Sequence, residues 1–231
     1  MPRAIAIETS GRIGSIALVD DATVLVEEQF PHGLKHAAEI IPIIDRLCRL
    51  RNWSARDIKH LYVSVGPGSF TGLRIGVTLA KTMALATGVK IVAVPTVRVL
   101  AENAPADANH LIIVLDAKRD QIFTARFERD GNEWIEHDPA HLDSLTEMIR
   151  RSPRSVHLHG EGIPYHKQFI PTDVDVKVTD ESSWTARASA VARIGSEMAE
   201  RNDFADPFTL TPIYIRRPEA EEKWLAQQKK Q

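Results

Sequence analysis

The stretch HLYVSVGPGSFTGLRIGVTLAKTMALATGVKIVAV, residues 60–94, predicts an apolar strand, a glycine-rich turn, an apolar helix and a second strand in succession. The turn fails both common nucleotide-binding templates. A Walker loop needs Lys and then Ser or Thr after its last glycine, whereas Leu73 and Arg74 follow Gly72 here. The dinucleotide fingerprint fails because Thr71 stands where its last glycine is required. The glycines therefore need another explanation.

The helix after the turn is apolar on nearly all of its faces. Gly72, Gly76, Ala80 and Ala84 recur every four residues, which places small side chains in one row along the helix. A glycine inside a helix costs about 1 kcal/mol relative to alanine, and close approach of another helix is the usual compensation. A surface helix of a lone molecule is covered on one side only. The row therefore favours contact with another subunit, and packing on the protein's own sheet is the alternative.

Composition limits the classes of function. The chain has 231 residues, enough for two lobes that share an interface, and 29 basic against 31 acidic residues give no overall attraction to nucleic acid. Its single cysteine, Cys48, excludes an internal disulfide and a zinc site made of thiolates. No segment has the apolar length of a signal-peptide core or a membrane span. We therefore expect a cytoplasmic protein with no membrane contact.

Hydrophobic periodicity predicts the element order βββαβα twice. In the first half, the expected strands and helices fall at 3–9, 14–20, 23–30, 35–50, 60–65, 71–87 and 90–94, followed by a short helix. From His110 onward we expect strands at 110–116, 121–128 and 133–136, a helix near 141–151, a strand at 155–160 and a long helix capped by serines near Ser183. This order predicts an α/β, duplicated ribonuclease-H-like fold with two lobes, the class of actin, Hsp70 and sugar kinases.

The predicted domain boundaries follow from this order. Residues 1–104 form an N-terminal lobe that carries the two long helices, and residues 105–210 form a C-terminal lobe. The polar stretch NAPADANH at 103–110 connects them. Residues 211–231 form a tail or a polar helix that packs back on the first lobe.

Residues 65–94 closely resemble the diagnostic segment of the TsaB (YeaZ) family. Further matching stretches are IAIETSGRIGSIAL at the start, HAAEIIPIIDRL in the first helix, LDAKRDQIF at 115–123 and PIYIRRPE at 212–219. The resemblance implies a duplicated actin-like fold. It also implies a noncatalytic activating subunit in the synthesis of N6-threonylcarbamoyladenosine (t6A) at position 37 of tRNA.

The same resemblance implies partners. The first-lobe helix pair joins the catalytic paralogue TsaD, or a second copy of the chain when TsaD is absent, and the ATP-dependent protein TsaE joins the complex. The chain is expected to have no cofactor of its own, with ATP or ADP at the interface of the complex, and to meet tRNA only through that complex. The residues expected at the partner interface are His36, Ile40, Ile43, Leu47, Leu50, Gly72, Leu73, Gly76, Ala80 and Met83.

The chain lacks the acidic and imidazole residues that the resemblance assigns to the catalytic paralogue. At its first turn the paralogue resembles ETSCDET, whereas this chain has ETSGRIG, with Arg12 and Ile13 in place of the two inner acids. Thr96 and Leu100 stand where the paralogue carries two metal-binding histidines. Neither arginine nor isoleucine ligates a metal in this chemistry. We therefore expect no catalytic residue and no metal site.

Other interpretations stay open at this stage. The N-terminus of the helix at 71–87 can hold an anion on the amides of Ser69, Phe70 and Thr71. The candidate nucleotide-binding residues are Glu8, Thr9, Ser10 and Ser69. For Glu8 we favour a turn cap, and for His157, His159 and His166 we favour roles other than metal binding. The competing function is a free-standing ATP-dependent phosphotransferase of the actin-like fold.

Overall fold

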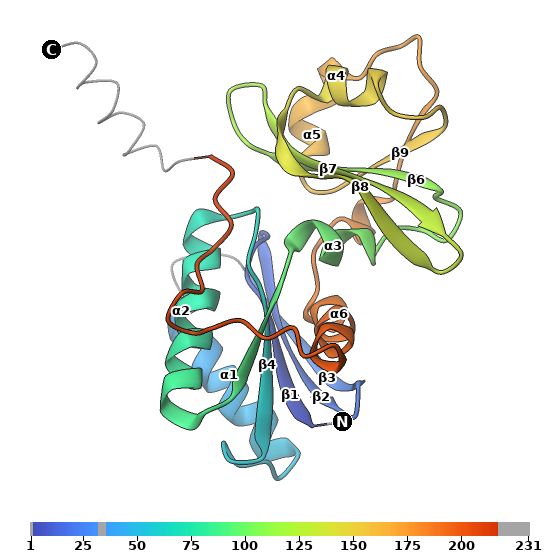
Figure 1. Cartoon of the computed structure of the whole chain (residues 1–231). Coiled ribbons are helices and arrows are strands. Elements are labelled where there is room, and N and C mark those ends of the chain that lie inside the picture. Colours follow the sequence, from blue (N-terminus) through green and yellow to red (C-terminus); the bar gives the residue numbers. More distant parts are fainter. Residues whose placement is uncertain (1, 32–35, 217–231) are drawn as a thin grey trace, which may run out of the picture.

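The computed structural model describes residues 2–31 and 36–216, which form two lobes, each built on a five-stranded sheet (Figure 1). The sheets have the orders β3-β2-β1-β4-β5 and β10-β9-β6-β7-β8. Because the second order repeats the first with equivalent strands, the two lobes share one topology. The predicted duplicated two-lobe α/β fold is confirmed.

The first lobe places two helices on one face of its sheet. Its strands β1, β4 and β5 are parallel, while β1, β2 and β3 form an antiparallel meander. Figure 1 shows α1 and α2 side by side over this face. The elements are β1 (Arg3–Glu8), β2 (Ile13–Asp20), β3 (Thr23–Pro31), α1 (His36–Leu50), β4 (Ile58–Ser64), α2 (Phe70–Thr87) and β5 (Lys90–Val94).

The second lobe repeats this order with shorter helices. The strand β10 and the helix α5 are absent from the sequence-based prediction, because three and four residues are too few to show a period. The elements are β6 (His110–Asp116), β7 (Ile122–Asp130), β8 (Glu133–Asp143), α4 (Leu145–Arg150), β9 (Val156–His159), α5 (Ile163–His166) and β10 (Val176–Val178).

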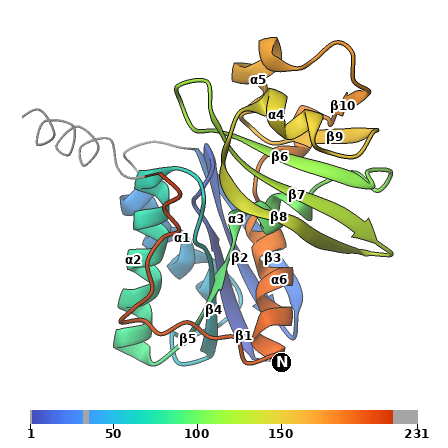
Figure 2. The ribbon, with the colours of Figure 1, turned by 45° about the horizontal axis from the view of Figure 1, so that its top comes forward.

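Each lobe sends its last helix to the other lobe. The helix α3 (Thr96–Ala101) packs on β6, β7 and β8, and α6 (Ala188–Glu200) packs on β1, β2, β4 and β5, opposite α1 and α2 (Figure 2). In sequence α6 falls within the predicted second lobe, 105–210, whereas in space it packs on the sheet of the first lobe.

The start of α6 also differs from the prediction. Ser183 ends a short 3₁₀ turn, and the helix begins after Arg187, whose side chain makes no capping bond. The N–H of Ala188 instead donates to the hydroxyl of Ser15 on β2, across 2.7 Å. The first sheet thus supplies the acceptor for an N–H at the start of the helix, whereas the sequence predicted that nearby serines would supply it.

The row of small residues on α2 faces the protein's own sheet. A Cβ on Gly72 would lie 1.9 Å from the carbonyl oxygen of Thr9, and one on Gly76 would lie 2.5 Å from the Thr9 hydroxyl. Ala80 is fully buried and Ala84 nearly so. The expectation that this row meets another subunit is wrong, because the close approach comes from Thr9, directly after β1, and from the Val63 side chain on β4.

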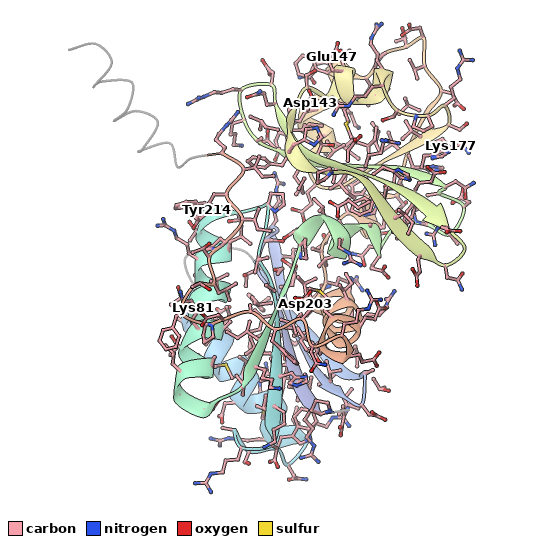
Figure 3. All side chains as sticks on the ribbon, in the orientation of Figure 1. Lys81, Asp143, Glu147, Lys177, Asp203 and Tyr214 are labelled. Atoms are coloured by element: carbon pink, nitrogen blue, oxygen red, sulfur yellow. The ribbon has the colours of Figure 1, made fainter. Side chains whose placement is uncertain are left out.

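After α6 the chain returns along the first lobe. Ala205 pairs with Ile91 at the free edge of β5, and the ammonium of Lys81 donates to the carbonyl oxygen of Leu210 across 3.0 Å. The N–H of Ile213 donates to the carbonyl oxygen of Val65 across 2.7 Å. We call residues 203–216 the strap; its expected continuation at 217–231 lies outside the described residues. Figure 3 shows Lys81 and Tyr214 beside α2.

Within residues 2–31 and 36–216, every helix is too short or too polar to cross a lipid bilayer.

Candidate functional site

A cleft of about 320 Å³ lies between the lobes. The β1–β2 turn and the loop before α2 line it from the first lobe. The end of β6, the following turn and the β9–α5 turn line it from the second. The equivalent ends of β1 and β6 thus meet at the cleft, as the shared topology of the lobes requires.

The glycine-rich loop is built to pack on the β1–β2 turn. The N–H of Ser69 donates to the carbonyl oxygen of Ser10 across 2.8 Å, and a Cβ on Gly68 would lie 2.5 Å from that same oxygen. The hydroxyl of Ser69 accepts the N–H of Gly72 across 3.3 Å and caps α2. The Ser69 amide is therefore engaged within the protein, which counts against the anion site considered from sequence.

Glu8 caps the β1–β2 turn from a fully buried position. Its Oε1 accepts the Ser10 N–H across 2.5 Å and the Ser10 hydroxyl across 2.6 Å, whereas Oε2 has no hydrogen-bond partner among the described residues. Burial raises the pKa of Glu8, and the hydrogen bonds from Ser10 offset this only in part. Of the four candidate nucleotide-binding residues, Ser10 and Ser69 line the cleft, while Glu8 and Thr9 are buried and do not.

Charged residues from both lobes line the cleft, and its two carboxylates each accept a hydrogen bond from one of them. The backbone N–H of Arg12 donates to the Glu161 carboxylate across 3.2 Å, and the Lys118 ammonium lies 2.7 Å from Asp116. Both cations lie over the ring of Tyr165, at 5.2 and 5.6 Å. Sequence reasoning missed Asp116, Glu161 and Tyr165, because only the pairing of the lobes brings them to the first turn.

Asp116 is held by three donors at the end of β6. It accepts the N–H and the ammonium of Lys118 at 3.0 and 2.7 Å, and lies 3.2 Å from Nε2 of the buried His166. Burial acts to raise the pKa of Asp116, but the hydrogen bonds and charge of Lys118, with His166, bring it below its usual value. His166 is thus positioned by a carboxylate that is already engaged.

The other two histidines singled out by sequence are also buried in the second lobe. Nδ1 of His159 lies 2.9 Å from the Thr179 hydroxyl, and burial lowers the pKa of His159 to about 4. Burial also lowers the pKa of His157. Among the described residues, no group of three His, Cys, Asp or Glu side chains is close enough to hold a metal ion.

The positions compared with metal-binding histidines have structural roles here. The hydroxyl of Thr96 accepts the N–H of Gly66 across 3.1 Å, and Leu100 is buried in the core between the lobes. Both residues therefore fix α3 and the glycine-rich loop in place.

A second feature is an apolar groove on the outer face of α1 and α2. It has a volume of about 380 Å³, and Ile41, which is 61% exposed, lies at its α1 side. Ile75 and Leu79 are half-buried, and Thr78 and Thr82 are exposed along the α2 side. Ile40 of the predicted interface set also lines this groove, and the other groove residues lie one or two positions from that set. The sequence therefore located the helix pair but selected mostly its inward faces.

The predicted interface residues divide by burial. Leu50 is 68% exposed, Met83 is half-buried, and the side chain of His36 lies outside the described residues. The residues that are buried in the first lobe are Ile40, Ile43, Leu47, Gly72, Leu73, Gly76 and Ala80. The helices bury most of these residues against the sheet, although Ile40 also lines the apolar groove, and contact of the set with a partner stays a prediction.

The fold and the interlobe cleft define a two-lobed α/β protein of the actin and sugar-kinase class. The inorganic polyphosphate/ATP-glucomannokinase of Arthrobacter sp. strain KM shares the fold with a TM-score of 0.50 and 12% identity, covering 87% of this chain and 100% of that one. YeaZ from Pseudomonas aeruginosa has a TM-score of 0.79 and 19% identity, covering 93% of this chain and 100% of its own.

Sequence similarity identifies the family. The family model described as TsaD, tRNA N6-adenosine threonylcarbamoyltransferase, matches residues 33–224. The tRNA threonylcarbamoyladenosine biosynthesis protein TsaB of Bacillus subtilis (strain 168) is 31% identical over 230 residues, covering 97% of this chain and 99% of that protein. The chain belongs to the TsaB family, and the resemblance noted in its sequence is confirmed.

Proposed function

We propose that the protein is a noncatalytic activating subunit for t6A synthesis on tRNA, and that it docks on TsaD through the outer face of α1 and α2. The names of the B. subtilis relative and of the matching family model support the pathway. The paralogous fold supports the mode of docking, because two related proteins can meet through equivalent helix pairs in a pseudo-twofold arrangement.

The apolar groove on α1 and α2 is the observation that carries this proposal. A hydrophobic side chain as exposed as Ile41, beside the apolar rows of Ile75 and Leu79, is costly in water and typical of a surface that another protein covers. Thr78 and Thr82 add small polar groups without charge, so a helix of a partner can lie close to α2.

The hydrogen bonds that the cleft carboxylates already accept support a noncatalytic role. Asp116 is bound to Lys118, and Glu161 accepts from Arg12 and from the hydroxyl of Thr185. Carboxylates that already serve as acceptors within the protein are poorly placed to hold Mg²⁺ and a nucleotide, which need free oxygen ligands. This arrangement also counts against the alternative of a free-standing phosphotransferase.

In this proposal the coupling to TsaD is a shift of populations: the docked chain favours the productive state of the TsaD site. TsaE joins the complex, ATP or ADP binds at its interface, and tRNA meets the chain only there. Without TsaD the same helix face pairs with a second copy of the chain. The proposal places these steps in the cytoplasm.

Reconstitution tests the proposal. We expect the purified chain alone to show neither ATP hydrolysis nor transfer of a threonylcarbamoyl group to tRNA. With tRNA, ATP and an activated threonylcarbamoyl donor present, adding it to TsaD and TsaE from the same organism should produce t6A, and leaving it out should reduce the product strongly. Steady ATP turnover by the chain alone would support the phosphotransferase instead, and equal t6A formation without the chain would refute an activating role.

A further inference from the structure

The strap connects three parts of the molecule that are far apart in sequence. Tyr214 stacks on Phe70 with ring centroids 5.1 Å apart, and its hydroxyl accepts a hydrogen bond from Nε of Arg74 across 3.0 Å. The Arg74 guanidinium lies 3.9 Å over the Phe70 ring and also lines the apolar groove. The strap is therefore attached to the exposed side of α2, directly beside the proposed docking face.

Two residues later the strap reaches the second lobe. The guanidinium of Arg216 donates through Nη1 to the carbonyl oxygen of Ala117 and through Nη2 to Oε1 of Gln121. Nη1 also lies 3.5 Å from the carbonyl oxygen of Lys118. A planar guanidinium with several donors suits this fork of acceptors, and a lysine in its place would satisfy fewer of them. Arg216 thus links the first lobe to the β6–β7 turn at the cleft.

The β6–β7 turn is strained and needs such support. Lys118, Arg119 and Asp120 have φ angles of 63°, 55° and 58°, so three consecutive residues with side chains adopt the left-handed conformation. This conformation is unfavourable for residues other than glycine. Two backbone hydrogen bonds hold the turn internally. The N–H of Ala117 donates to the carbonyl oxygen of Gln121 across 3.0 Å, and the N–H of Gln121 donates to the carbonyl oxygen of Lys118 across 3.2 Å. Arg216 binds the same backbone from outside.

We propose that Tyr214 and Arg216 form a clamp that couples the outer face of α2 to the β6–β7 turn, so that a protein docked on this face fixes the cleft. The turn carries Lys118, whose position over Tyr165 shapes the cleft. A partner that covers Arg74 restricts Tyr214 and, through the short strap, Arg216. The clamp is a property of the free chain; only its response to a partner rests on the proposed function.

Hydrogen–deuterium exchange on the full chain tests the clamp. In Arg216→Gln we expect the amides of 117–121 to exchange about tenfold faster than in the wild type, because charge-assisted hydrogen bonds to the turn are lost. Arg216→Lys should lie between the two. Arg150→Gln, on the exposed side of α4, is the matched control and should leave 117–121 unchanged. Equal exchange of 117–121 in the wild type and Arg216→Gln would overturn the clamp.

A second comparison adds TsaD and follows the same amides. Binding is recorded separately by mass, so the two ideas can fail independently. If binding slows exchange at 117–121 in the wild type and not in Arg216→Gln, the coupling is supported. If TsaD binds and exchange at 117–121 does not change, the coupling is refuted while the docking stands. If TsaD does not bind, the proposed function and the coupling both fail, and the clamp is decided by the first comparison.

Discussion

Gly72 and Thr9 touch so closely that no side chain fits between them: a Cβ on residue 72 would lie 1.9 Å from the Thr9 carbonyl oxygen. This contact presses the start of α2 onto the end of β1. The N–H of Ser69 also donates to the carbonyl oxygen of Ser10 beside this contact. The glycine-rich loop therefore has a structural role, which is to pack the start of α2 on the β1–β2 turn. The loop thereby lines the cleft and positions α2, whose residues line one side of the groove.

Gly72→Ala should therefore disrupt the first lobe. Because the clash is with backbone, the helix must move, and we expect a loss of about 3 kcal/mol or more in the free energy of unfolding. Gly88→Ala is the matched control, since Gly88 ends α2 at φ 77° with open space around it and costs only about 1–2 kcal/mol of strain. Urea unfolding of both variants makes the comparison. Equal losses would show that the close contact has no special weight.

Gly76→Leu should destabilise the first lobe, and not simply prevent pairing. The added side chain points at the Thr9 hydroxyl and at Val63, both inside the lobe. Overpacking of this size costs about 1–3 kcal/mol or more. Thermal unfolding should show a clearly lower midpoint than the wild type. A folded, equally stable Gly76→Leu variant that had only lost its partner would restore the discarded view that the row is an exposed contact surface.

Glu8 should make stability depend on pH. Its folded-state pKa lies above the usual value of 4.5, so the folded protein binds this proton more tightly than the unfolded chain. The contribution of Glu8 to the free energy of unfolding is then greatest below pH 4.5 and is lost as pH rises through the raised pKa. Glu8→Gln should remove this fall in the free energy of unfolding. At pH values above the raised pKa, the variant should be more stable than the wild type.

Urea unfolding across a pH series measures the Glu8 effect, with Glu133→Gln, an exposed acid on β8, as the control. The two variants are compared with the wild type at each pH. A wild-type curve that runs parallel to that of Glu8→Gln at all pH values would contradict the raised pKa.

The hydroxyl of Thr179 is the centre of a buried network in the second lobe. It donates to the Leu158 carbonyl oxygen at 3.1 Å and accepts from Nε1 of Trp184 at 2.9 Å, so Nδ1 of His159 must carry the proton it shares. Thr179→Val leaves Nε1 of Trp184 and Nδ1 of His159 without this acceptor, while the Leu158 carbonyl oxygen still accepts the N–H of residue 179, and should cost about 2–3 kcal/mol. Thr146→Val, which loses one bond, should cost about 1 kcal/mol. Urea unfolding followed by tryptophan fluorescence distinguishes the two costs.

Sequence predicted the elements well because their signals are local. The period of 3.6 residues and the glycine at 88 predict a helix at 71–87, and the structure has α2 at Phe70–Thr87. What sequence did not decide is which face of α2 is covered. Spacing four apart marks a close approach, but a strand such as β1 can provide it as well as a helix, and the direction depends on tertiary contacts.

The site was harder to predict for the same reason. Asp116 and Glu161 are far apart along the chain, and they reach Arg12 only after the two lobes close on each other. The exchange of α3 and α6 between the lobes has no local signal either, since each helix looks like the end of its own half. The resemblance to a family predicted the fold, whereas the structure was needed to show which helix faces are buried and which are exposed.

Measuring the mass of the chain with TsaD is the most direct test of the docking face. Ile41→Asp places a charge in the exposed groove without touching the core, so we expect normal folding and binding at least about thirtyfold weaker. Ile135→Asp, on β8 of the other lobe and 43% exposed, is the matched control and should bind TsaD as the wild type does. Loss of the complex in Ile41→Asp alone is the predicted result, and a complex of undiminished affinity in Ile41→Asp would contradict the account.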